Sequence, residues 1–560
     1  MRNIFTIAIF ALSISAFAQL PAYNWAFSLG TLNDDYHTDL ITDPAGNIYI
    51  TGFTTLMIDM DPGPGSTIVG VTGLQNCFLA KYDPEGNLDW AMAWNGGGYQ
   101  LGMDQNNNVI ITGTFTNTTT IGTQMLTSLG WDDIFLASVS PGGIVNWAFS
   151  FGGIEPDQPT ALTIGSGGYI FLGGRTKLNV DFDPGPESFI LNGQGLYDGF
   201  FARYTEQGQF VWAKMFTTSA DEEVSHIESD NSGMLYVGGT FRLPMDFSLG
   251  AGSPILTPIG INDHFIAAYD TAGTFQWARQ FGGVGNSSLL FSGLGNNWNS
   301  GPAIAVSGNF LDTLYIGTTS MYDAYGPVDI YTLVYDNSGN LLTSLTLGGA
   351  GAFSFAGEVV VQDNELIQSG SFSGTVDLDP RVVLDTMFTA SSQKDAFLVR
   401  YSESLEPLGI YMWEGTGEDY AFQLTMDAGE NLLLGVRFDG TLYQQPLTQA
   451  DPAISLGGID FSIIKLGNSI IPNGLEQNDP GSFSMHPVPA KDYFNIQTSS
   501  LLVAGNLTVY NSSGLIVYTQ SFSHETYIKT VDTSTWPIGI YFVKVQTDKG
   551  DAIQKLIIAR

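Results

Sequence analysis

Three Asp-x-Asp-Pro motifs combine residue types and a spacing that could do chemistry in this sequence of 560 residues. Each brings two carboxylates beside loop carbonyl groups, and Ca²⁺ prefers such hard oxygen ligands. The predicted Ca²⁺ ligands are Asp59, Asp61, Asp181, Asp183, Asp377 and Asp379. The alternative interpretation is that the motifs are solvated acidic loops, made rigid by proline, that keep the protein soluble. No copy has the twelve-residue spacing of an EF-hand, which favours the solvated loops.

Other catalytic or cofactor motifs do not stand out. The five histidines are scattered, with no pair at the spacing of metal ligands. No Gly-x-Ser-x-Gly elbow, Cys–His arrangement or phosphate-binding loop is visible. We therefore predict a non-catalytic protein with no cofactor other than the candidate Ca²⁺. The alternative is a polysaccharide hydrolase or lyase, because such enzymes need only two carboxylates at the right distance.

The elements that must position these residues belong to a long repeat. An aromatic-led strand of the type Phe-Leu-Ala-x-Tyr starts at Phe78, Phe135, Phe200, Phe265, Tyr331, Phe397 and Phe461. The spacings are 57, 65, 65, 66, 66 and 64 residues. A fixed period of this length indicates one small antiparallel sheet per repeat, which must stack on its neighbours to bury its faces.

The ends of the array predict how it closes. A Trp-bearing strand follows the aromatic strand in the early repeats, at Trp90, Trp147, Trp212 and Trp277. The last repeat lacks this strand, whereas a spare copy containing Trp25 stands alone near the N-terminus. Ring closure by the spare strand removes exposed sheet edges. The sequence therefore predicts an all-β fold, a seven-bladed β-propeller over residues 19–469 closed by the N-terminal strand, with the Trp rings packed between blades.

The order of strands within a blade predicts where the acidic loops lie. We expect the strand of the Asp39-Leu-Ile-Thr42 type to be innermost and the Trp strand outermost. The Asp-x-Asp-Pro insertions and the connections between blades then share one face, where a second acidic set gathers: Asp34, Asp35, Asp157, Glu222, Glu223, Glu418 and Asp419. The fifth blade, around 287–325, departs most from the repeat and is where we would first expect a single site.

Composition and the N-terminus indicate the compartment. The formal net charge is −36, which excludes recognition of nucleic-acid phosphates and of anionic membranes. Residues 1–18 are typical of a secretory signal peptide, and no later stretch is long enough to span a membrane. Cys77 is the only cysteine, so no intrachain disulfide can form, and we expect a buried, inert thiol.

A second domain follows a polar linker over residues 470–481. Alternating strands between 482 and 560 predict a small antiparallel β-sandwich. This segment resembles the type A C-terminal sorting domain of the type IX secretion system of Bacteroidetes. The residues that carry the resemblance are Pro487, Pro489, Ala490, Gly514, Gly539, Tyr541 and Lys555. The resemblance implies export by the type IX machinery and a place outside the cell or on the outer-membrane surface.

The repeats themselves are similar to the propeller repeat called SBBP, through Asp43-Pro-Ala-Gly46 turns and the Phe-Leu-Ala-Lys-Tyr strands. That family implies no activity. The sequence thus predicts a secreted or cell-surface propeller that serves as a binding, adhesion or display module. Its ligand would be a glycan, a protein or an ion held at the acidic face.

Overall fold

The computed structural model describes residues 21–250, 255–283, 288–298, 301–381, 387–391, 393–444, 452–470, 483–486, 493–498, 504–511, 516–523, 528–537, 539–547 and 550–558. The predicted signal peptide lies outside these residues. The chain forms two compact units, Met1–Ser469 and Ile470–Arg560. All regular structure in the described ranges is β-strand, so no helix there could cross a membrane.

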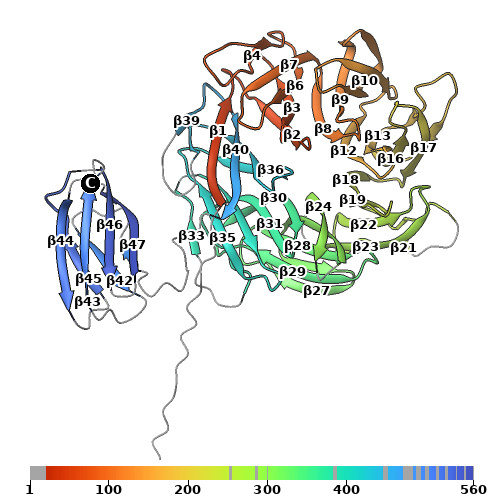
Figure 1. Cartoon of the computed structure of the whole chain (residues 1–560). Coiled ribbons are helices and arrows are strands. Elements are labelled where there is room, and N and C mark those ends of the chain that lie inside the picture. Colours follow the sequence, from red (N-terminus) through yellow and green to blue (C-terminus); the bar gives the residue numbers. More distant parts are fainter. Residues whose placement is uncertain are drawn as a thin grey trace, which may run out of the picture. The chain divides into compact units, whose positions relative to one another are not determined.

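Within the first unit, seven antiparallel sheets of four core strands follow one another in the described residues. The first strand of each sheet lies against the first strand of the next, and the first strand of the seventh sheet lies against that of the first. Figure 1 shows the resulting ring of sheets around a centre. The first strands are therefore innermost, as the sequence predicts.

The first three sheets take their strands in chain order. They are β2 (Tyr36–Thr42), β3 (Ile48–Thr54), β6 (Asn76–Tyr82) and β7 (Leu88–Asn95); β8 (Gly97–Met103), β9 (Val109–Ile121), β10 (Gln124–Val139) and β11 (Val145–Phe151); and β12 (Gln158–Ile164), β13 (Ile170–Thr176), β16 (Asp198–Tyr204) and β17 (Phe210–Phe216).

The next three sheets repeat this order, and a hairpin of β26 (Thr313–Ile316) and β27 (Thr319–Asp323) extends the outer edge of the fourth. Their strands are β18 (Glu223–Ser229), β19 (Leu235–Phe241), β22 (Asp263–Tyr269) and β23 (Phe275–Gly283); β24 (Ser288–Trp298), β25 (Gly301–Phe310), β28 (Asp329–Asp336) and β29 (Leu341–Leu347); and β30 (Phe353–Gln362), β31 (Glu365–Ser373), β34 (Asp395–Tyr401) and β35 (Pro407–Trp413).

The seventh sheet joins the two ends of the first unit. It contains β36 (Asp419–Met426), β37 (Leu432–Phe438) and β40 (Asp460–Ile470), and its fourth strand is β1 (Pro21–Leu29). The strand that stands alone in the sequence therefore completes the last sheet. Pairing β1 with β40 covers an edge that would otherwise offer free backbone groups.

The tryptophans bind neighbouring sheets together at equivalent places. The indole of Trp90 in the first sheet donates a hydrogen bond of 3.0 Å to the Pro141 carbonyl in the second sheet. Each later tryptophan likewise donates to a carbonyl of the sheet that follows its own: Trp147 to Glu206, Trp212 to Thr271 and Trp277 to Asn337. Trp25 in β1 donates to the Pro84 carbonyl of the first sheet at 3.1 Å. The contact across the ring junction thus repeats the contact made between other sheets.

Strand pairing corrects the register of the seventh repeat by one residue. In the first six repeats the leading aromatic pairs with a glycine, as Phe78 does with Gly52, and a Cβ on Gly52 would come within 2.7 Å of that ring. In the seventh repeat the corresponding pair is Ser462 with Val436. The sequence-based start at Phe461 is wrong by one position, because the repeat has lost both the aromatic residue and the glycine that mark it.

The second unit contains two sheets among its described residues. One consists of β41 (Phe483–His486), β42 (Tyr493–Thr498) and β45 (Ile528–Asp532), and the other of β44 (Ile516–Ser523), β43 (Ala504–Asn511), β46 (Gly539–Thr547) and β47 (Gly550–Ile558). Side chains from both sheets, including Phe494 and Val543, share one buried core. A core between two antiparallel sheets matches the small β-sandwich that the sequence predicts.

The residues that carry the sorting-domain resemblance fall partly within this described structure. Gly539 and Tyr541 lie in β46 and Lys555 lies in β47. The Tyr541 hydroxyl donates a hydrogen bond of 2.8 Å to the Pro537 carbonyl. Pro487, Pro489, Ala490 and Gly514 lie outside the described residues.

Candidate functional site

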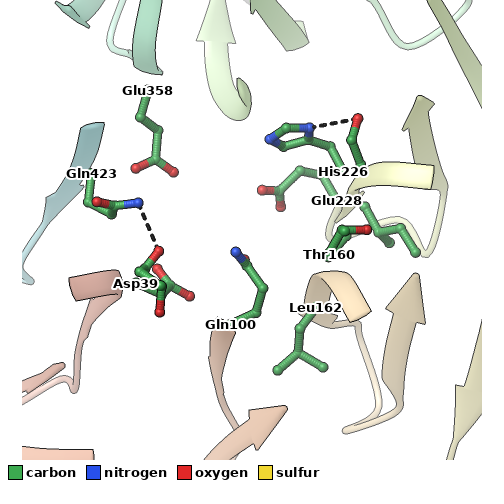
Figure 2. A pocket seen from close by; sticks show the side chains of 12 residues that line it. Asp39, Gln100, Thr160, Leu162, His226, Glu228, Glu358 and Gln423 are labelled. Carbon is green, nitrogen blue, oxygen red and sulfur yellow. Dashed lines mark hydrogen bonds between the residues drawn. The ribbon is translucent and has the colours of Figure 1, made fainter. Parts of the chain in front are cut away.

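The first strands surround a cavity at the centre of the ring. Six of them supply its described lining, and two adjoining compartments of about 300 and about 70 Å³ share Asp39, Gln100, Leu162, Glu228 and Glu358. Figure 2 shows the side chains of Glu228, Glu358 and Gln100 turned toward the same space. Carboxyl groups therefore stand where the two compartments meet.

A β-bulge in every first strand positions these side chains. Each first strand shifts register against its second strand at the same place, for example between His37 and Asp39 and between Val224 and His226. Bulges re-aim the side chains that follow them. The seven equivalent positions after the shift are Asp39, Gln100, Ala161, His226, Phe291, Glu358 and Gln423.

Asp39 and Glu358 make equivalent hydrogen bonds to the first strand of the next sheet. One oxygen of Asp39 accepts a hydrogen bond of 2.6 Å from the backbone N–H of Leu101 in the next first strand. One oxygen of Glu358 accepts a bond of 2.7 Å from the equivalent N–H of Leu424. Each carboxyl group thus satisfies a backbone donor of its neighbour, which is a sufficient structural reason for these two residues.

Glu228 differs, because it lies two residues beyond the equivalent position and no neighbouring repeat has an acid there. Burial, together with the charge of Asp39, raises the pKa of Glu228 to about 8. Burial raises the pKa of Asp39 to about 6, and burial raises the pKa of Glu358 well above its usual range. At neutral pH the cavity therefore contains an ionised Asp39 beside protonated glutamic acids.

The rest of the described lining is uncharged and includes both polar and apolar side chains. Nδ1 of His226 lies 3.3 Å from the Ser225 hydroxyl, and burial lowers the pKa of His226 to about 4, so its imidazole is neutral. The described lining contains no lysine or arginine. An acid, a base and several hydrogen-bonding groups in one cavity can bind a polyhydroxylated or cationic ligand, and can also transfer protons.

The predicted Ca²⁺ ligands lie elsewhere, in hairpins between the second and third strands of three different sheets. In the first hairpin, of β4 (Ile58–Asp59) and β5 (Ile68–Val69), Asp59 accepts bonds from the backbone of Asp61 and Thr67 at 3.1 and 2.8 Å. Asp181 and Asp183 make the corresponding turn contacts next to β14 (Asn179–Asp181), which pairs with β15 (Ile190–Asn192).

Asp377 and Asp379 repeat this turn at β32 (Thr375–Asp377), which pairs with β33 (Met387–Thr389), and Asp379 also binds Arg381. The described residues contain no group of three or more histidine, cysteine or acidic side chains arranged to hold a metal. The turns explain the carboxylates without an ion, and Ca²⁺ binding there stays a prediction.

The residue between the two aspartates explains why the motif recurs. Its side chain is buried, and its carbonyl accepts a hydrogen bond from the tyrosine that ends the aromatic strand. These bonds run from Tyr82 to Met60, from Tyr204 to Phe182 and from Tyr401 to Leu378, at 2.8, 3.0 and 2.8 Å. The fourth repeat makes the same bond from Tyr269 to Phe247 at 2.7 Å, although Ser248 stands there in place of the second aspartate. In the second repeat, which lacks the motif, the tyrosine is replaced by Val139, whereas the fifth repeat lacks the motif and keeps Tyr335, whose buried hydroxyl has no hydrogen-bond partner among the described residues.

The second acidic set differs from the expectation of a solvated rim. Asp35, Asp157, Glu222 and Asp419 are buried between neighbouring sheets. Large apolar side chains are exposed both in the connections between sheets, at Leu32 and Ile154, and where second strands lead into third strands, at Leu129, Trp131, Ile261, Tyr325 and Leu456. The connections between sheets thus carry these four acids inward and Leu32 and Ile154 outward.

Sequence reasoning placed the innermost strand correctly but missed the cavity residues. Its first choice for a single site was the fifth blade, whereas the described lining comes from the other six sheets. Aligning the first strands on their Leu or Ile would have placed Asp39, Gln100, His226, Glu358 and Gln423 in one column. The bulge that turns this column inward leaves no signature in the residue types.

Comparison with known proteins gives matches to both units. Residues 484–559 match the family model described as secretion system C-terminal sorting domain. An uncharacterized WD repeat-containing protein of Acanthamoeba polyphaga mimivirus is 24% identical over 517 residues, covering 76% of this chain and 36% of that protein. The regulatory protein FlaEY of Caulobacter vibrioides is 23% identical over 210 residues, covering 35% of this chain and 21% of that protein. The chain thus spans about a third or less of these relatives.

Solved structures resemble the chain only distantly. A Synechocystis apocarotenoid oxygenase mutant aligns at 11% identity with a TM-score of 0.34, covering 80% of this chain and 94% of that chain. The extracellular domain of a putative one-component system of B. thetaiotaomicron aligns at 9% identity with a TM-score of 0.15, covering 97% and 100%. The C-terminal match is more informative: residues 484–559 match a secretion system C-terminal sorting domain, which indicates a protein exported by the type IX system to the cell surface or beyond.

Proposed function

We propose that residues 19–469 are a seven-bladed β-propeller of the SBBP type, exported by a bacterium of the Bacteroidetes, that binds a saccharide in its central cavity without catalysing a reaction. The propeller assignment is supported by the seven sheets in ring order, by β1 as the last strand of the seventh sheet and by the repeated tryptophan contact across the junction. A fold that encloses a cavity at its centre suits a binding role.

The observation that carries the binding proposal is the set of three carboxyl groups around one cavity, with no cationic side chain in the described lining. Asp39, Glu228 and Glu358 offer oxygen acceptors, and the protonated acids also offer donors, which together suit sugar hydroxyl groups. Leu162 and Met103 add apolar surface for the C–H faces of a sugar ring. A compartment of about 300 Å³ is at the lower end of the sizes of small-molecule sites.

A glycan array probed with the full chain at pH 6 tests this proposal. We expect the wild-type chain to bind a defined subset of saccharides and the Glu228→Ala variant to bind them about tenfold more weakly, because the variant removes the donor and the acceptor of the buried carboxyl group. Glu85→Ala is the matched control, because Glu85 is an exposed carboxylate in the β6–β7 turn. Equal binding by the wild type and the Glu228→Ala variant would contradict the proposal.

A polysaccharide hydrolase or lyase is the second candidate, and the difference between the pKa values of Asp39 and Glu228 favours it. Asp39, with a pKa of about 6, could act as a base while Glu228, with a pKa of about 8, could act as an acid. Pairs of carboxyl groups with different pKa values carry out general acid–base catalysis in glycosidases.

Incubation of the full chain with the polysaccharides identified on the array distinguishes binding from hydrolysis and lysis. New reducing ends or unsaturated products that disappear in both Asp39→Asn and Glu228→Gln variants would establish an enzyme. Binding without product would leave the non-catalytic function.

A further inference from the structure

Four pairs of buried carboxyl groups lie between neighbouring sheets, outside the central cavity. The first member of each pair stands two residues before the repeat's leading aromatic position, and the second stands at the start of the next sheet's first strand. The pairs are Asp133 with Asp157, Asp198 with Glu222, Asp395 with Asp419, and Asp460 with Asp35. All eight side chains are at most 2% exposed.

The same backbone contact holds each pair. The N–H of the second member donates to the carbonyl just before the first member, with Asp157 bound to Asp132 at 2.8 Å and Asp419 bound to Lys394 at 3.1 Å. Glu222 and Asp35 make the equivalent bonds at 3.0 and 2.7 Å. Between the fifth and sixth sheets Ser354 makes this bond instead, so the backbone geometry does not itself require an acid.

Several oxygens of these pairs are buried without a hydrogen-bond partner among the described residues. They are Oδ1 of Asp35, Oδ1 of Asp133, both carboxyl oxygens of Asp419 and Oδ1 of Asp460. Beside Gly152 two oxygens converge: a Cβ added there would lie 2.6 Å from Oδ1 of Asp133 and 2.9 Å from Oδ2 of Asp157. A buried acceptor without a donor lowers the stability of the folded state, and a proton between the two carboxyl groups would supply the missing donor.

The cations that neighbour these pairs in the chain are bound to other acids. Arg175 pairs with Glu223, Arg242 with Asp221 and Lys394 with Glu418. The further titratable groups that act on the pairs are themselves acidic: Asp132 on Asp133, Glu155 on Asp157, Asp221 on Glu222, Asp439 on Asp419, and Asp34 on Asp35 and Asp460. Two adjacent buried carboxylates in such surroundings cannot both ionise at low cost.

We propose that each of the four pairs holds one proton in the folded ring, shared as an O–H···O hydrogen bond between its two carboxyl groups, and that these bonds fasten neighbouring sheets. In three of the pairs a shared proton gives the unpartnered oxygens a donor, and in all four it removes one of two like charges. The closing junction of the ring, where Asp460 of β40 meets Asp35 before β2, is fastened in the same way as the others.

The pKa shifts have the direction that this arrangement requires. Burial first, and nearby carboxylates second, raise the pKa of Asp157 to about 7 and that of Asp419 to about 9. Carboxyl groups in an unfolded chain titrate near pH 4. A raised folded-state pKa means that the folded chain keeps protons that the unfolded chain releases, so stability is full at about pH 4 and is lost as pH rises through 6 to 9.

Thermal unfolding of the full chain as a function of pH tests the proposal. We expect the melting temperature of the wild type to fall between pH 5.5 and pH 9, and that of Asp419→Asn to fall less, because the amide resembles the protonated acid at every pH. At pH 9 the Asp419→Asn variant should therefore melt above the wild type. Glu85→Gln, which changes an exposed carboxylate, should follow the wild type throughout.

Asp157→Asn repeats the test at a second pair and should behave like Asp419→Asn. A lower melting temperature than the wild type for both variants at every pH, or failure of both to fold, would overturn the proposal. Addition of Ca²⁺ or EDTA at pH 9 forms the last arm. A rise with Ca²⁺ in the wild type that is absent from Asp419→Asn would show a cation between the carboxylates in place of a proton, and no response supports the proton.

Discussion

At the scale of single residues, the protonation state of Glu228 has the largest expected effect on the cavity and on the stability of the fold. It faces the cavity with a pKa raised to about 8, and the described lining holds no cation to stabilise its charge. Its stabilising contribution is present at low pH and is lost as pH rises through about 8, because the folded-state pKa exceeds the unfolded one.

The Glu228→Gln change should therefore leave stability at pH 4 unchanged and raise it at pH 9. We expect a gain of about 1–2 kcal/mol at pH 9, a value reduced for the partial access of solvent to the cavity. Urea unfolding at both pH values measures the difference. A variant that is less stable than the wild type at pH 9 would show that the charge is compensated by a group in the cavity.

Tyr401 offers a second residue-scale prediction with an internal control. Its hydroxyl donates a hydrogen bond of 2.8 Å to the Leu378 carbonyl, whereas the buried hydroxyl of Tyr335 has no hydrogen-bond partner among the described residues. Tyr401→Phe should cost about 1 kcal/mol and Tyr335→Phe should cost nothing. Chemical denaturation of both variants checks this, and equal effects would contradict the role given to the Asp-x-Asp turn.

Residue roles were the least predictable part of the molecule. The acids of the connections were expected in solvent because acidic residues usually are, yet Asp35 and Asp419 are fully buried. Whether these acids are buried depends on how two neighbouring sheets pack. An aspartate in such an interface cannot be distinguished in the sequence from an aspartate in an exposed loop, so its burial could not be predicted.

At the scale of elements, two devices organise the ring. A bulge turns side chains of six first strands into the cavity, and the fourth-strand tryptophan of the early repeats donates a hydrogen bond to the turn of the next sheet. The turn glycine allows this contact: Gly339 has a φ of 75°, and a Cβ there would come within 2.7 Å of the Trp277 ring.

Trp25 tests whether the closing contact is equivalent to the others. Trp25→Ala and Trp212→Ala should each cost about 2 kcal/mol, because both half-buried rings lose packing and one hydrogen bond. Trp131→Ala is the control, since Trp131 is 67% exposed. Calorimetric melting of the three variants measures this, and a harmless Trp25→Ala would argue against closure by β1.

Elements were more predictable than residues because turn chemistry and strand periodicity are local. Asp-x-x-Gly turns and alternating apolar strands predict the order of β2, β3, β6 and β7, and the spare Trp25 strand predicts the pairing of β1 with β40. The register of the seventh repeat could not be predicted, because Ser462 replaces the aromatic residue that marks it elsewhere.

At the scale of the whole molecule, the chain divides the work between its two units. The first unit contains the cavity, and the second contains the match to the sorting domain. The polar linker over 470–481 and several separated motifs, among them the one with Gly539 and Tyr541, predict this division, and the described strands of the second unit have their own core.

Removal of residues 470–560 should stop export and leave the first unit folded. In a host with a type IX system we expect the full chain at the cell surface or in the medium and the shortened chain inside the cell. Cell fractionation with immunoblotting measures this. A shortened chain that still reaches the surface would contradict the role of the C-terminal unit.

The central claim is that the ring binds its ligand at the cavity carboxyl groups. Titration calorimetry of the strongest array saccharide into the full chain at pH 6 tests it most directly. The account predicts one site per chain, with affinity about tenfold weaker in Glu228→Ala and unchanged in Glu85→Ala. Undiminished binding by Glu228→Ala would place the ligand elsewhere and contradict the account.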